Sequence, residues 1–225
     1  TANIAGSPIA LSTNLKNLGV YLDSSLSLNR QVNQLSSSRY YHIRQLNHIR
    51  PFMTTDTAKT ISHAIVFSRL DYCNSLLAGL PACDIRRLQI VQNAAARLYG
   101  GLSRRDHVTP VLRDDLHWLP VEQRIQFKIG VLTYKALHGL APPYLAEMCV
   151  PTLSNPAVLR NRSADRMDLV IPRTRTVTFG RCAFAVAAPS FWNTIPVDLR
   201  RSTTVSAFRS GLKTFLFRAA YNITA

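Results

Sequence analysis

DIRRLQIVQNAAARLYGG, residues 84–101, is the stretch that decides the fold class of this chain. A helix turns by about 100° per residue, and at that spacing five apolar side chains share one face, namely Ile85, Leu88, Val91, Ala95 and Leu98. The glycines at 100 and 101 favour a helix end, because glycine readily adopts the left-handed conformation found there. The stretch therefore predicts a helix over about 84–99.

The same helical periodicity recurs on both sides of this stretch. It predicts further helices over about 27–50, 54–77, 121–138 and 205–221, with packed short helices within 184–199. Ser27 and Thr54 are the expected caps, and Pro51 is an expected stop. Gly, Ser and Pro in residues 1–23 indicate a short β element with a buried strand at 18–22, and two β-rich runs, 169–171 and 176–179, could pair. We expect a mainly α fold, a helical array with a small N-terminal β element and a short β-hairpin near 168–180.

Positive charge is the strongest functional signal. The 225 residues include 27 basic and 12 acidic side chains, giving a formal net charge of +15, while 47% hydrophobic residues exclude a disordered basic tail. Arginines outnumber lysines by 22 to 5, and a guanidinium pairs with phosphate through a planar fork of donors. This balance favours a nucleic-acid partner, and the alternative is an ordinary solvated basic surface.

The candidate phosphate contacts fall into three groups. The first group lies on predicted helices: Arg86 and Arg97 share a helix face with Asn93, and a basic line on the helix at 121–138 could follow a phosphate backbone. The second group lies in the loop at 101–120, and the third lies in the arginine-rich segment at 151–181. The alternative for the helix residues is an ordinary solvated face, and the alternative for the segment at 151–181 is a mobile surface loop. The candidates are Arg86, Arg97, Arg104, Arg105, Arg124, Lys128, Lys135, Arg160, Arg162, Arg166, Arg173 and Arg175.

No self-sufficient catalytic or metal site is predicted. Adjacent aspartates such as Asp114 and Asp115 bind Mg²⁺ in many polymerases, but there they sit on a β-hairpin with a third carboxylate nearby. Here the flanking residues favour a helical turn followed by a loop. Four cysteines and six histidines show no metal-ligand spacing, which predicts reduced thiols and an intracellular location, nuclear or cytoplasmic. We also expect no secretory signal, no membrane span and no small-molecule substrate.

Several blocks, read together, resemble a known family. They lie in collinear order over nearly the whole chain: LGVYLD at 18–23, SRLDYCNSLL at 68–77, LQIVQNAAARL at 88–98, LHWLPV at 116–121, RIQFK at 124–128, APPYL at 141–145, WNTIP at 192–196 and FRSGLKTFLF at 208–217. These blocks resemble the carboxy-terminal part of LINE-type, Jockey-related non-LTR retrotransposon reverse transcriptases. One block alone would be a weak signal, whereas several in order are specific.

The resemblance implies the part of an RNA-directed DNA polymerase that follows the catalytic palm. Residues 1–23 would end a palm-like β element, 24–150 would form a thumb-like helical domain that grips an RNA–DNA duplex, and 151–225 would be a basic region that helps to hold template RNA or target DNA. The family's catalytic aspartates lie upstream of the matched blocks. We therefore expect no cofactor in this chain, Mg²⁺ only together with the palm, and no polymerase activity from the chain alone.

A different class of function stays open. The chain could be a non-catalytic protein-interaction or scaffold module, such as a co-opted retroelement remnant, whose arginines meet acidic protein surfaces. Expected partners are thus RNA, DNA or an RNA–DNA hybrid together with the rest of the polymerase, or acidic protein surfaces on the alternative. A chain that starts at Thr1 rather than Met suggests a fragment or a processed product.

Overall fold

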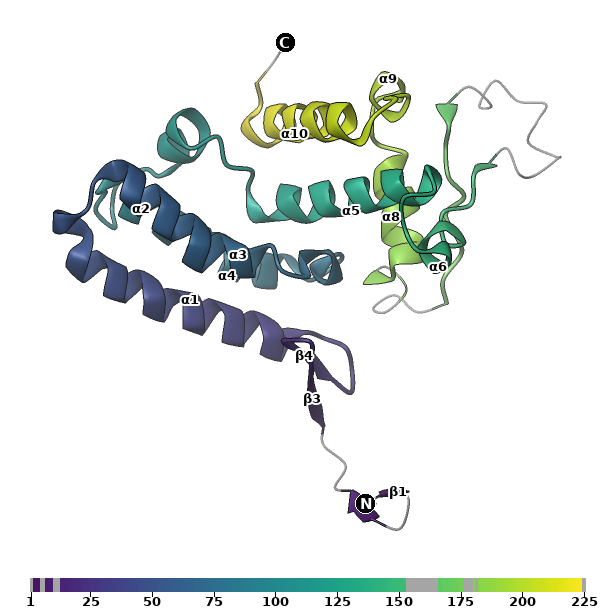
Figure 1. Ribbon diagram of the computed structural model, residues 1–225, viewed down its shortest axis with the longest axis horizontal. Coiled ribbons are helices and arrows are strands. Elements are labelled where there is room, and N and C mark those ends of the chain that lie inside the picture. Colours follow the sequence, from purple (N-terminus) through teal and green to yellow (C-terminus); the bar gives the residue numbers. More distant parts are fainter. Residues whose placement is uncertain are drawn as a thin grey trace.

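The chain is mainly helical, as the sequence predicts (Figure 1). The computed structural model describes residues 2–4, 7–9, 13–152, 166–175, 180 and 182–223. Within these ranges the strands form two antiparallel hairpins near the N-terminal end, and everything else with regular structure is helical.

Three long helices begin and end close to the predicted residues. The helix α4 spans Ala82–Gly100, α5 spans Val121–Leu137 and α10 spans Val205–Tyr221. Gly101 follows α4 in the left-handed conformation that ends a helix, with a φ of 62°. At the start of α10, the Thr204 side chain accepts a hydrogen bond from the backbone N–H of Ala207 at 3.2 Å, an N-cap.

The first long helix has a different cap from the predicted one. Helix α1 spans Asn29–Ile49 and is followed by the short 3₁₀ turn η1, Arg50–Phe52. The N-cap position is Leu28, and the Ser27 hydroxyl accepts a hydrogen bond from the backbone N–H of Asn29 at 3.3 Å. The carboxylate of Asp23 holds the approach to the helix and accepts hydrogen bonds from the backbone N–H groups of Ser27 and Leu28 at 2.9 and 3.0 Å. Hydrogen bonds from Ser25 and Ser27 lower the pKa of Asp23 to about 2.

The prediction of a single helix over 54–77 is wrong, because the structure has four short helical segments there. Helix α2, Thr55–Ser62, starts as predicted with Thr54 capping, and is followed by a wide π-helical turn η2, His63–Phe67, then by α3, Ser68–Leu70, and the 3₁₀ turn η3, Asn74–Leu77. The Ser68 hydroxyl donates to the carbonyl of Ala64 at 2.5 Å, and Cys73 has a φ of 52°. That left-handed residue stops the helix, and a hydrophobic pattern alone does not reveal it.

The predicted N-terminal β element is present, but its strand is less buried than expected. Strands β1, Ala2–Ile4, and β2, Ser7–Ile9, form one hairpin, and β3, Asn14–Asn17, and β4, Val20–Asp23, form a second. Of the predicted strand at 18–22, only Val20 is fully buried. Leu18 and Gly19 form the two-residue turn. Strand β4 of this second hairpin packs against α1, whereas the first hairpin lies farther from the helices (Figure 1).

The turn of this second hairpin predicts a stabilising substitution. Leu18 and Gly19 have φ values of 45° and 83°, as in the type I′ turn that favours Asn-Gly, and the Leu18 side chain is 82% exposed. Leu18→Asn should raise the free energy of unfolding by about 1 kcal/mol, because asparagine tolerates positive φ better than leucine. Urea unfolding measures the change. Leu15→Asn, on the exposed side of β3, is the control that should not stabilise, and an equal gain there would contradict the turn-based explanation.

The hydrophobic core joins two groups of helices. Helix α1 packs along α4 on one side, and α5 packs against α10 and against α8, Phe184–Trp192, on the other, with α4 touching α5 between them. Gly130 of α5 permits this close approach, because a Cβ there would come within 3 Å of side-chain atoms of Leu212 and Phe191. The core is continuous across residue 150, where the sequence predicts a boundary.

Near 168–180, where the sequence predicts a β-hairpin, the described residues pair with the segment at 150–152. Leu169 forms a single antiparallel bridge with Pro151, and Val170 donates its N–H to the carbonyl of Val150 at 2.9 Å. Its expected partner, 176–179, lies outside the described residues. The remaining short helices are η4, Val111–Asp115, α6, Pro143–Ala146, and α9, Val197–Arg200.

Candidate nucleic-acid interface

A basic groove lies where α5 and α10 run antiparallel to each other (Figure 1). On each helix, two basic residues four apart share one face, since one turn of helix separates them. The floor and far wall come from η2, from the turn after α3 and from the loop at 116–119, which enclose a volume of about 530 Å³. Its charged and polar lining comprises Arg124, Lys128, Arg209, Lys213, His63, His117, Asp71 and Asn74.

Three cations of this groove are available to an anionic ligand. Lys128, Arg209 and Lys213 are exposed, and none of them forms an ion pair with any carboxylate in the described part of the chain. The only acid in the lining, Asp71, is already paired with Arg124. The groove therefore carries a net positive charge that an anion such as phosphate would offset.

Arg124 has a structural partner of its own. Its guanidinium makes a two-pronged contact with the Asp71 carboxylate, with 2.8 Å from Nε to Oδ1 and a second bond from Nη2 to Oδ2, and it lies 4.7 Å from the centre of the Phe67 ring. The side chain is only 18% exposed. These contacts join α5 to the segment around α3, and the expected phosphate contact of Arg124 stays a prediction.

The floor of the groove is fixed by Trp118. This buried indole donates from Nε1 to Nε2 of His63 at 3.2 Å, and its ring packs edge-on against Phe67. The Trp118 carbonyl accepts a hydrogen bond from the Tyr221 hydroxyl at 2.7 Å, which joins the loop to the end of α10. These bonds hold the floor of the groove to both walls, so the helices that carry the cations are fixed relative to each other.

The bond between Trp118 and His63 predicts a pH dependence of stability. Nε2 of His63 accepts this bond and must be unprotonated; burial, followed by the charges of Arg124 and Lys59, lowers the pKa of His63 below 6.5. As the pH falls below 6.5, the unfolded chain binds more protons than the folded one. The contribution of His63 to stability is therefore complete above pH 6.5 and is lost as the pH falls toward the lower pKa of the folded state.

Urea unfolding at pH 7.5, 6.5 and 5.5 measures this loss. His63→Gln is the matched control, because an amide oxygen can accept the Trp118 bond at every pH. The wild-type protein should lose more stability than His63→Gln between pH 7.5 and 5.5, and parallel curves for the two proteins would contradict the assignment.

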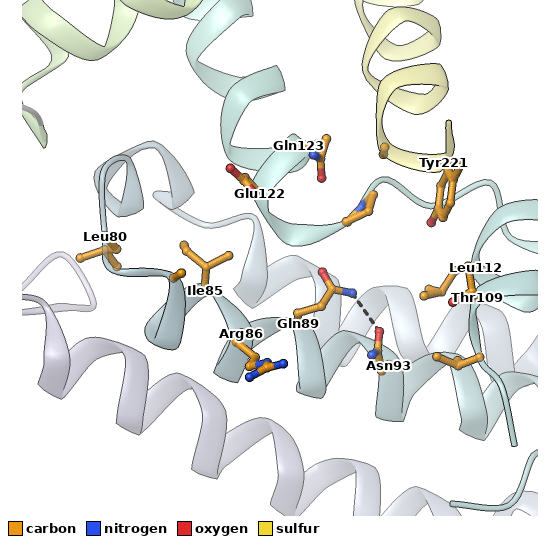
Figure 2. Close-up of a pocket in the computed structure, with 14 residues that line it drawn as sticks. Leu80, Ile85, Arg86, Gln89, Asn93, Thr109, Leu112, Glu122, Gln123 and Tyr221 are labelled. Carbon is orange, nitrogen blue, oxygen red and sulfur yellow. Dashed lines mark hydrogen bonds between the residues drawn. The ribbon is translucent and has the colours of Figure 1, made fainter. Parts of the chain in front are cut away.

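A second cavity contains another predicted residue, Arg86. It has a volume of about 630 Å³ and lies between α4, the start of α5 and the end of α10. Figure 2 shows Gln89 and Asn93 of α4 below Glu122 and Tyr221, with Gln89 donating to Asn93 at 2.8 Å, and Arg86 lying lower along the same helix. Its charged lining is Arg86 and Glu122, so this cavity lacks the positive excess of the basic groove.

Arg97, expected beside Arg86, faces a different part of the protein. It is half-buried, and its Nη2 donates weakly to the carbonyl of Asp106 at 3.5 Å. Its charge acts on Tyr40 of α1, where it partly offsets the rise in pKa that burial causes. The two arginines predicted to share a face thus do not line one cavity.

The other predicted contacts are scattered over the surface. Arg104 and Arg105 are exposed in the loop after α4, and Lys135 is half-buried on α5 outside the groove lining. Arg166, Arg173 and Arg175 are exposed before α8, while Arg160 and Arg162 lie outside the described residues. Of the twelve candidates, the structure brings Arg124 and Lys128 together in the basic groove.

Sequence reasoning missed two groove residues, Arg209 and Lys213. A usable signal was present, because α10 contains Arg209, Lys213 and Arg218 but no acidic residue, and the first two are four positions apart opposite its apolar face. Only the packing of α10 beside α5 places them opposite Lys128.

The expected helical turn at Asp114 and Asp115 is confirmed. Both residues lie in η4, where the Asp114 carboxylate pairs with neighbouring Arg113 at 2.7 Å. In the described part of the chain, no three His, Cys, Asp or Glu residues are grouped to hold a metal ion. Nor does any helix in these ranges combine the length and apolar character that crossing a membrane requires.

Comparison with known proteins leaves the family open. No protein-family model, no curated protein and no solved structure matches this chain.

Proposed function

We propose that this chain is the nucleic-acid-gripping carboxy-terminal part of an RNA-directed DNA polymerase of a non-LTR retrotransposon. In this role it holds a duplex while a catalytic palm, supplied by the rest of the polymerase, binds Mg²⁺ and performs the chemistry. The chain itself contributes binding and no catalytic residue, and its working location is intracellular, where the RNA and the target DNA are found.

The observation that carries the proposal is the basic groove. Lys128, Arg209 and Lys213 extend from two packed helices over a fixed floor, with no carboxylate paired to any of them in the described residues. Lysine and arginine at helical spacing contact successive phosphates without reading sequence, which is the requirement for a polymerase that must accept any template. The class of polymerase proposed here is supported by the resemblance of the collinear sequence blocks.

Fluorescence anisotropy with a labelled RNA–DNA hybrid tests the proposal. The affinity should fall linearly on a plot of log K against log salt, with a slope that corresponds to several phosphate contacts at about 0.9 per contact. RNA and DNA duplexes of the same length serve as competitors that rank the three ligands. Absent or salt-insensitive binding by a folded, monodisperse sample would overturn the proposal.

A second candidate function is a protein-interaction module, and exposed apolar side chains favour it. Leu15 and Leu18 of the second hairpin are 62% and 82% exposed, and Phe52 at the end of α1 is 89% exposed. Exposed apolar side chains that gather in one patch mark protein contacts, and Leu15 and Leu18 belong to the same hairpin. On the leading proposal, the hairpin side chains contact the palm. On the alternative, they contact an unrelated protein partner, and an RNA–DNA hybrid would not displace the chain from that partner.

A further inference from the structure

A smaller basic pocket lies on the other side of the α3 segment from the groove. It is enclosed by the second hairpin, the middle of α1 and α3, and has a volume of about 170 Å³. Three cations line it, one from each element: Lys16, Arg39 and Arg69. Arg69 and Tyr72 line this pocket, whereas Asp71 and Asn74 line the groove, so the two sites are separate.

The charges of this pocket are not balanced within the protein. Its lining holds no acidic residue, and none of its three cations forms an ion pair in the described ranges. Burial, and then the nearby charge of Arg69, lower the pKa of Arg39, so the two guanidinium groups repel each other. An anion between them would turn that repulsion into two attractions.

Arg39 is held in place while part of its guanidinium stays unmatched. Its Nη1 donates to the carbonyl of Ile65 at 2.5 Å and its Nη2 to the Ser38 hydroxyl at 2.8 Å. Its Nε is buried and has no hydrogen-bond partner. A buried donor without a partner costs free energy, so the protein leaves the guanidinium of Arg39 only partly satisfied.

The walls of the pocket are fixed as well. The Tyr72 hydroxyl donates to the carbonyl of Leu18 at 2.7 Å, which ties the hairpin turn to the segment after α3. The Gln31 side chain accepts from the backbone N–H of Tyr21 at 3.0 Å, which ties β4 to α1. The backbone of the hairpin that carries Lys16 is therefore fixed against α1 and the segment after α3.

We propose that this pocket binds a single phosphate group. Its volume of about 170 Å³ is less than a third of that of the basic groove, which suits a compact tetrahedral anion. Guanidinium groups are the donors that recognise phosphate oxygens best. The site goes beyond duplex gripping in the groove, and the phosphate is either free or the terminal phosphate of a nucleic-acid strand.

Amide NMR of the full chain, titrated with inorganic phosphate at constant ionic strength, tests this site. Saturable shifts are expected at Lys16, Gly19 and Ser38 in the wild-type protein. Arg69→Gln should raise the dissociation constant for phosphate about tenfold, because it removes a charge-assisted contact. Arg44→Gln, an equal charge change on the exposed face of α1, should change it less than about twofold.

Two further comparisons separate the sources of the phosphate and the two sites. Tighter binding of a 5′-phosphorylated trinucleotide than of its 5′-hydroxyl form would assign a strand end, and equal binding would assign free phosphate. Lys213→Gln should leave the phosphate titration unchanged, so a failure of duplex binding in the groove does not affect this test. An absence of saturable shifts in the folded wild-type protein, or equal effects of Arg69→Gln and Arg44→Gln, would overturn the proposal.

Discussion

Replacing the three available cations of the basic groove by glutamine should remove most of the binding of an RNA–DNA hybrid. The variant is Lys128→Gln, Arg209→Gln and Lys213→Gln combined. Each cation that neutralises a phosphate releases counterions, so each loss lowers the slope of log K against log salt by about 0.9. The slope should therefore fall by about 2 to 3, and the affinity near 0.1 M salt should fall by about a hundredfold or more.

A charge-matched variant distinguishes this groove from the general basic surface. Arg30→Gln, Arg44→Gln and Arg218→Gln remove the same charge from exposed positions outside the groove lining. Long-range attraction weakens in both variants, but the slope should fall by less than about 1 in the control, because these side chains touch no phosphate. Equal slopes in the two variants would show that hybrid binding is spread over the whole surface, which contradicts a groove-centred grip.

The folding of both variants is expected to stay intact. Lys128, Arg209 and Lys213 are exposed and form no ion pair in the described chain, so their removal takes no packing from the core. Arg124 is left unchanged for the opposite reason: its pairing with Asp71 and its contact with Phe67 join two elements, so a loss of binding in Arg124→Ala would mix folding with recognition.

Local sequence signals predicted the long helices well. Apolar spacing and caps are properties of neighbouring residues, so α4, α5 and α10 begin and end within a few residues of expectation. The breaks after α2 were missed, because the left-handed Cys73 follows from how the segment packs on α5. The role of Asp23 in holding the approach to α1 was missed because it lies several residues before the helix.

The candidate site was predictable only in part for a similar reason. Lys128 was found because its helix shows a basic line beside an apolar stripe. Arg209 and Lys213 lie some eighty residues away along the chain, and only the antiparallel packing of α10 on α5 puts them beside it. The sequence pattern likewise shows that Arg124 is basic but not that Asp71, on another element, already neutralises it.

Replacing Arg200 by methionine should cause a large loss of stability. Arg200 is only 4% exposed, and its guanidinium donates to the carbonyls of Ile195 and Arg166 at 2.8 and 2.7 Å and to the carboxylate of Asp168 at 2.6 Å. Arg200→Met keeps the apolar stem but leaves these acceptors without their donor. Breaking a buried ion pair from one side costs about 3 to 5 kcal/mol, which lowers the melting temperature by about 10 °C in a chain of this length.

The order of three variants identifies the guanidinium network as the cause. Asp168→Asn should cost less than Arg200→Met, because the guanidinium keeps its carbonyl partners and the carboxylate is 26% exposed. Arg218→Met, on the exposed side of α10, should be close to neutral. Urea unfolding followed by tryptophan fluorescence suits this test, because buried Trp192 donates to the carbonyl of Met167 in the same segment. A small loss for Arg200→Met would mean that water replaces the guanidinium, and the segment at 166–169 would then depend on Trp192 and Asn193 for its attachment to α8.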